Sequence, residues 1–120
     1  MAVSLSNREA DIMAVLWELG PSTVTEVRAR LSDDLAYTTV LTILRNLEAK
    51  GYATHSADGR AHRFAAAVRQ STARKSALRH LTGKLFKGSA DLLLTHLVSD
   101  QKLTEDQVRR IRKILEENSK

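Results

Sequence analysis

Cysteine is absent from this chain of 120 residues. Its absence excludes disulfide bonds, thiolate metal sites and cysteine chemistry, and it is typical of a cytosolic protein. Long apolar runs are missing too, since none approaches the roughly 18 residues that a membrane span needs. The opening residues Met-Ala-Val-Ser-Leu-Ser-Asn-Arg-Glu contain no apolar segment typical of a secretion signal. We therefore expect a cytoplasmic protein without membrane insertion.

The residue arrangements that support catalysis are also lacking. We find no Ser/His/Asp arrangement, no Gly-rich phosphate loop and no paired carboxylates. We interpret the four histidines, at positions 55, 62, 80 and 96, as having no carboxylate partner at short or helical spacing, and we expect no metal site. The sequence predicts a protein that is not an enzyme and needs no cofactor.

The net charge of +5 is distributed unevenly. Residues 1–66 carry seven basic and eight acidic side chains, a net charge of −1, whereas residues 67–120 carry twelve and six, a net charge of +6. The basic excess begins between Arg69 and Lys87, before the acidic Asp91. Two interpretations stay open: the solvated face of a long helix, or a surface near a DNA backbone that raises non-specific affinity.

Capping boxes, in which Ser or Thr is followed three residues later by Glu or Gln, predict three helix starts. They are Ser6 with Glu9, Thr23 with Glu26, and Thr104 with Gln107. The first two begin short helices that end near Gly20-Pro21 and Ser32-Asp33-Asp34. A third helix from Tyr37 to Lys50 follows, so the spacing predicts a helix-turn-helix.

The Tyr37–Lys50 helix has one apolar face and one unusual polar face. At helical spacing, Val40, Ile43, Leu44 and Leu47 share the apolar face. The predicted DNA-binding side chains on the other face are Thr38, Thr42 and Arg45, with Thr39 and Asn46 at its margins. Arginine can bind guanine through two hydrogen bonds, and threonine can hydrogen-bond bases or touch a thymine methyl group. This face predicts a recognition helix for the DNA major groove.

Two short strands, over residues 52–57 and 61–65, flank an Asp-Gly turn. This pattern predicts a β-hairpin, and a hairpin directly after a recognition helix is a wing. Arg60 at the tip and Arg63 on the return strand are expected to contact phosphates or the minor groove, although arginines in turns are often only solvated.

The last third of the chain predicts three more helices with apolar stripes. They are too few to make a good independent core, so we expect a second copy to cover them; folding back onto the winged domain is the alternative. The predicted dimerisation residues are Leu78, Leu81, Leu85, Leu93, Leu94, Leu97, Ile111 and Leu115. The fold class expected is mainly α with a small β-wing: a winged helix-turn-helix over residues 1–68 and a helical dimerisation layer over residues 69–120.

Several stretches resemble the BlaI/MecI family of penicillinase-type repressors, in order and over nearly the whole chain. They include Leu5-Ser6-Asn7-Arg8-Glu9, Thr23-Val24-Thr25-Glu26-Val27, Ala36-Tyr37-Thr38-Thr39-Val40-Leu41-Thr42, Gly59-Arg60-Ala61-His62-Arg63-Phe64 and Leu85-Phe86-Lys87-Gly88-Ser89.

The resemblance implies a dimer that binds an inverted repeat, typically with TACA/TGTA half-sites, and blocks transcription. It also implies release by proteolysis in the dimerisation region, triggered by a membrane sensor-protease that detects β-lactams. Well-known members are cut at Asn-Phe, and this chain has His96-Leu97 at about that place. The alternatives are a winged-helix regulator released by a small ligand, and a winged helix that binds only proteins.

Overall fold

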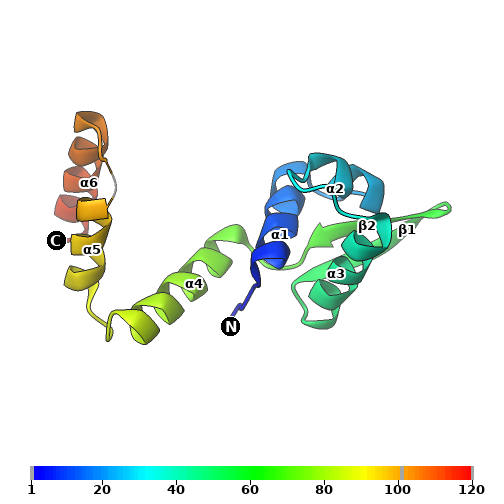
Figure 1. The fold of residues 1–120 in the computed structure, drawn as a ribbon, viewed down its shortest axis with the longest axis horizontal. Helices are drawn as coiled ribbons and strands as arrows, with labels where there is room; N and C mark the ends of the chain where they lie inside the picture. Colours follow the sequence, from blue (N-terminus) through cyan, green and yellow to red (C-terminus); the bar gives the residue numbers. More distant parts are fainter. Residues whose placement is uncertain (1, 101, 120) are drawn as a thin grey trace. The chain divides into compact units, whose positions relative to one another are not determined.

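The computed structural model describes residues 2–100 and 102–119. Residues up to Leu78 form one compact unit, and residues from Arg79 form another. The mainly helical architecture with one small hairpin (Figure 1) confirms the prediction of a mainly α fold with a small β-wing. In chain order the elements are α1 (Asn7–Leu19), α2 (Val24–Arg30), α3 (Tyr37–Ala49), β1 (Ala53–Asp58), β2 (Ala61–Ala66), α4 (Gln70–Leu85), α5 (Ala90–Asp100) and α6 (Glu105–Asn118).

All three predicted capping boxes are formed, at the starts of α1, α2 and α6. At α1, for example, the backbone N–H of Glu9 donates to the Ser6 hydroxyl, and the Ser6 N–H donates to the Glu9 carboxylate. These reciprocal bonds satisfy backbone donors that a helix start otherwise leaves without a partner. They fix where each of the three helices begins.

The core of the first unit lies between α1, α2 and α3. Its fully buried side chains come from all three helices and are at most 1% exposed; they are Ile12, Met13, Leu16, Val27, Val40, Leu44 and Leu47. Phe64 on β2 adds an aromatic ring to this core at 2% exposure. Burial of such side chains contributes about 1.5–3 kcal/mol each, so the core sets the orientation of α3.

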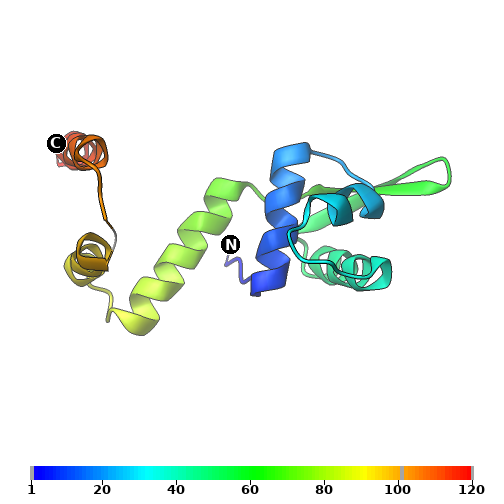
Figure 2. The same ribbon diagram turned by 45° about the horizontal axis from the view of Figure 1, so that its top comes forward.

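The two strands pair in antiparallel register, with Ala57 opposite His62. Gly59 in the turn has a φ of 62°, a left-handed value that glycine adopts without steric cost. On the other edge of β2, Ser22 and Phe64 exchange two backbone hydrogen bonds of 2.9 and 2.8 Å. This bridge attaches the hairpin to the segment before α2, while the tip extends past the helices (Figure 2).

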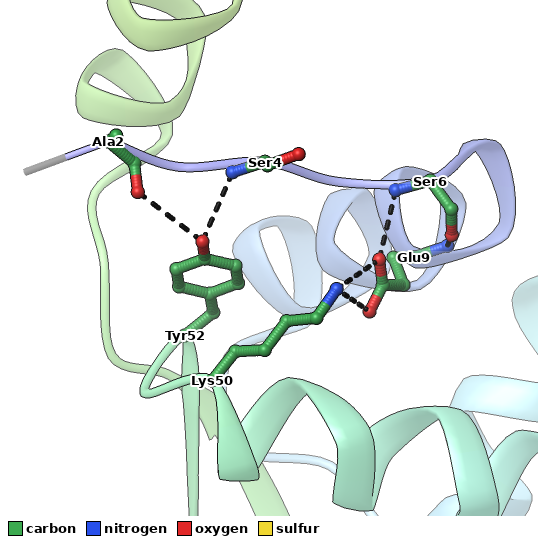
Figure 3. A network of polar contacts seen from close by, with 6 residues as sticks. All are labelled: Ala2, Ser4, Ser6, Glu9, Lys50 and Tyr52. Atoms are coloured by element: carbon green, nitrogen blue, oxygen red, sulfur yellow. Dashed lines mark hydrogen bonds and ion pairs between the residues drawn. The ribbon is translucent and has the colours of Figure 1, made fainter.

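A partly buried ion pair joins α1 to the residue that ends α3 (Figure 3). The Lys50 ammonium, just after α3, lies 2.9 and 2.8 Å from the two carboxylate oxygens of Glu9 in α1. The Glu9 side chain is 9% exposed and that of Lys50 is 45% exposed. The Glu9 carboxylate therefore caps α1 and also anchors the C-terminal end of α3.

The ring of Tyr52 extends the same network to the N-terminal segment (Figure 3). Its hydroxyl accepts a hydrogen bond of 3.1 Å from the Ser4 N–H and donates one of 3.4 Å to the Ala2 carbonyl. Val3 is buried, and its N–H donates to the Ser76 hydroxyl at 2.7 Å. The N-terminal segment thus packs against both the end of α3 and the first half of α4.

The second unit leaves its apolar side chains largely exposed. The Ser89 hydroxyl accepts a hydrogen bond of 3.1 Å from the Leu92 N–H and so caps the start of α5. The ring of Phe86 lies edge-on to His96, with 5.5 Å between centroids. Within the described part of the chain, no residue of α5 or α6 is buried.

Among residues 2–100 and 102–119, no helix combines the length and the apolar character that crossing a membrane requires.

The Glu9–Lys50 pair gives a stability prediction. Burial raises the pKa of Glu9, but the hydrogen bonds and charge of Lys50 and the bonds from Ser6 outweigh it, so the pKa lies below the ordinary value. Glu9→Gln keeps the shape and loses the charge, and we expect the free energy of unfolding at pH 7 to fall by about 1–2 kcal/mol. Urea unfolding measures this change.

The pH dependence follows from the lowered pKa of Glu9. A carboxylate with a lowered folded-state pKa stabilises the protein above its unfolded-state pKa and loses that effect as the pH falls through the folded-state value. The difference in the free energy of unfolding between Glu9→Gln and the wild type should therefore shrink as the pH is lowered. Asp11→Asn, at an exposed position on the same helix, is the matched control. Equal stability of Glu9→Gln and wild type at pH 7 would contradict a stabilising pair.

Candidate nucleic-acid interface

Helix α3 presents its polar face to solvent because its apolar face is fully used in the core. Val40, Leu44 and Leu47 are 0% exposed. The side chains predicted to bind DNA lie on the opposite side, and the structure places all five in exposed positions: Thr38, Thr39, Thr42, Arg45 and Asn46. The packing of α3 therefore brings the five together on one open surface.

The start of α3 differs chemically from the starts of α1 and α2. Its N-cap residue is Ala36, which makes no side-chain capping bond. The first-turn N–H groups of α3 thus have no capping side chain, and the positive end of the helix dipole lies beside Thr38 and Thr39. These N–H groups can donate to an anion that approaches the exposed face.

A groove of about 740 Å³ lies between α3 and the hairpin. Arg45 of α3 and Arg60 of the hairpin tip both line it, so two arginines border one concave surface. Its apolar walls include Leu41 and Phe64, and Tyr37 also lines it with a side chain that is 46% exposed. Paired cations around an open groove suit an extended polyanion better than a small apolar ligand.

Two histidines of the hairpin line the groove, and one of them contacts α3. His55 on β1 stacks on His62 of β2, with ring centroids 5.0 Å apart and planes 5° apart. The His55 Nδ1 also lies 2.5 Å from a carboxylate oxygen of Glu48 on α3. The contact between His55 and Glu48 fixes the position of the hairpin relative to α3.

The two arginines predicted on the wing have different surroundings. Arg63 donates to Glu26 at 2.9 Å, and Glu26 is also the capping-box residue of α2. Hydrogen bonds from Thr23, together with the charge of Arg63, hold the pKa of Glu26 below its ordinary value. Arg63 therefore ties β2 to α2, whereas Arg60 is exposed at the hairpin tip.

The interpretation of the histidines as lacking carboxylate partners is wrong. His96 Nδ1 lies 3.8 Å from the Asp100 carboxylate, at i,i+4 spacing in α5, and His55 contacts Glu48. The first pair was visible in the sequence as helical spacing, whereas the second joins different elements. No group of three or more metal-ligating side chains occurs among the described residues.

Several groove residues were absent from the predicted site. Glu48, His55, His62 and Leu41 line the groove. The sequence signal for these residues is weak because a histidine in a strand and a glutamate in a helix belong to no motif. Their side chains come together only when the hairpin folds against α3. Tyr37, at the start of α3, also lines the groove and was likewise absent from the predicted site.

A helix with an exposed polar face, followed by a hairpin that flanks the same groove, defines the winged-helix class of fold. Solved structures of this class resemble the chain. Wild-type MarR from E. coli shares 16% identity over 95% of this chain and 78% of that one, with a TM-score of 0.53. A transcriptional regulator from Thermotoga maritima shares 21% over 94% and 77%, with a TM-score of 0.52. These similarities show the fold.

Comparison of the amino-acid sequence with known proteins identifies the family. The family described as penicillinase repressor matches residues 5–117. The transcriptional regulator BlaI of Mycobacterium tuberculosis is 34% identical, in an alignment that covers 74% of this chain and 79% of that protein. The methicillin resistance regulatory protein MecI of Staphylococcus aureus is 20% identical over 113 residues, 92% of each chain. The chain belongs to the penicillinase repressor (BlaI/MecI) family of transcriptional repressors and is not an enzyme.

Proposed function

We propose that this repressor acts as a homodimer that binds a pseudo-palindromic operator, with α3 in the major groove and the β1–β2 hairpin as a wing. The observation that carries the proposal is the exposed face of α3, where Thr38, Thr42 and Arg45 replace the Glu and Lys side chains of an ordinary solvated helix. Hydroxyl, methyl and guanidinium groups match the donors, acceptors and methyl groups of base edges.

In this arrangement Arg45 reads a guanine through two hydrogen bonds, and Thr38 and Thr42 lie against neighbouring bases. Thr39 and Asn46, at the margins, contact phosphates together with the first-turn N–H groups of α3. Arg60 supplies a phosphate or minor-groove contact from the wing. Residues 1–66 have a net charge of −1, so the affinity of this half of the chain for DNA depends on a few well-placed cations such as Arg45 and Arg60.

Dimerisation is proposed from the apolar side chains of the second half of the chain. Leu78, Leu85 and Leu97 are 54%, 72% and 48% exposed in the single chain, and Leu115 is 53% exposed. Large apolar side chains left exposed in this number favour an interaction site, and identical copies most often pair by a two-fold axis. The other proposed interface residues are Leu81, Leu93, Leu94 and Ile111.

Release of the operator is proposed to follow cleavage of the dimerisation region near His96 and Leu97 by a membrane sensor-protease. Both residues are exposed, and they lie within α5. A protease binds an extended segment, so local unfolding of α5 has to precede cleavage. Cleavage would remove the surface that holds two DNA-binding units together. Release by a small ligand is the alternative signal.

The test of DNA reading is selection of binding sites from random duplexes. We expect enrichment of an inverted repeat whose two half-sites lie on the same face of the DNA double helix. Arg45→Ala should cost about 1–3 kcal/mol on the selected site and relax the preference at one base pair. Arg8→Ala removes an exposed arginine of α1 and is the matched control. Enrichment of no palindrome would overturn the proposal.

The test of assembly is sedimentation at micromolar concentration. The wild type should sediment as a dimer, and Leu94→Glu with Leu97→Glu should give a monomer because two carboxylates cannot be buried without partners. Leu19→Glu is the matched control, since Leu19 is an exposed leucine of α1, 38% exposed. A wild-type monomer at this concentration would contradict the half-site geometry.

A further inference from the structure

The hydroxyl group of Thr42 is already engaged within its own helix. Its Oγ1 donates a hydrogen bond of 2.8 Å to the carbonyl oxygen of Thr38, one turn earlier in α3. Threonine in a helix commonly forms this bond to the residue four positions before it. The residue is nevertheless exposed, at the centre of the polar face of α3.

This bond changes what Thr42 can offer to a ligand. The hydroxyl has one proton, and that proton is taken by the Thr38 carbonyl. The oxygen is turned back onto the helix, which leaves the Cγ2 methyl group as the other branch of the side chain. On the exposed face, Thr42 therefore acts as an apolar residue with a weak acceptor, and it has no hydrogen to donate.

The Thr38 side chain has a different chemistry. Within the part of the chain that the structure describes, no hydrogen bond of the Thr38 hydroxyl is found, and the residue is exposed in the first turn of α3. Its hydroxyl can both donate and accept. Two threonines one turn apart on the same face thus present unlike groups, a hydroxyl and a methyl.

We propose that Thr42 is a specificity-determining residue that recognises thymine through the C5 methyl group. In the major groove thymine presents one acceptor, O4, and one methyl group. Thr42 has no proton for O4, but its methyl group can pack against that of thymine. The adenine amino group and the cytosine amino group lack this apolar surface. The inference rests on the proposed function, because it assumes that α3 reads base edges.

The experiment uses the full-length protein and the duplex obtained by site selection. Each thymine of one half-site is replaced in turn by uracil, which removes only the C5 methyl group. Binding of each duplex is measured for the wild type, for Thr42→Ser, which deletes the protein methyl group, and for Thr42→Val, which keeps a methyl group and removes the hydroxyl. Thr38→Ser and Thr38→Val are the matched controls one turn away.

For the wild type, uracil at one position should weaken binding about four-fold, the effect of burying one methyl group. Thr42→Val should keep this sensitivity, Thr42→Ser should lose it, and both Thr38 variants should keep it. The inference alone is overturned if no uracil substitution weakens DNA binding by the wild type, or if the selected half-site has no thymine. It is equally overturned if binding by Thr42→Ser is still weakened by uracil. It is also overturned if Thr42→Val loses sensitivity to uracil, because the retained methyl group then does not account for the recognition. Enrichment of no duplex overturns the proposed function and this inference with it.

Discussion

The rest of the structure depends on the burial of one face of α3. Val40, Leu44 and Leu47 are completely excluded from solvent, so rotating the helix about its axis would expose three large apolar side chains. At about 1.5–3 kcal/mol per side chain, such a rotation would remove much of the stability of a small domain. The polar face is therefore held outward by the core. The Glu9–Lys50 pair and the contact between His55 and Glu48 add fixed points at the end of the helix and at the wing.

The fixed orientation of α3 determines where the cations of the site lie before any ligand binds. The first half of the chain has no basic excess to attract DNA, so its few cations have to be in position before binding. Arg45 and Arg60 border the same groove although they come from a helix and a hairpin. The Ser22–Phe64 backbone bridge and the Arg63–Glu26 ion pair hold β2 in place beside α2. A surface that is ordered in advance loses less entropy on binding.

The sequence predicted the features that depend on local chemistry. Capping boxes such as Thr23 with Glu26 satisfy the donors of their own helix, and the Asp-Gly turn shapes its own hairpin, so both were predictable and both are confirmed. The polar face of α3 followed from helical periodicity. Contacts between distant residues were not predictable: Lys50 meets Glu9 across 41 positions, and Arg63 meets Glu26 across 37. The hydroxyl bond of Thr42 depends on a side-chain rotamer that no sequence pattern specifies. The DNA contacts, the interface residues and the cleavage region stay predictions.

The central claim, that the α3 face and the wing read DNA, is tested most directly by NMR of the ¹⁵N-labelled protein titrated with the selected duplex. The account predicts that the largest amide shifts fall on the exposed residues of α3, among them Thr38, Thr42 and Arg45, and on the hairpin tip at Arg60. A scrambled duplex should give smaller shifts at the three α3 residues. Shifts concentrated instead on the groove between α1 and the α2–α3 connection, around Arg8 and Leu35, with α3 unchanged, would contradict the account.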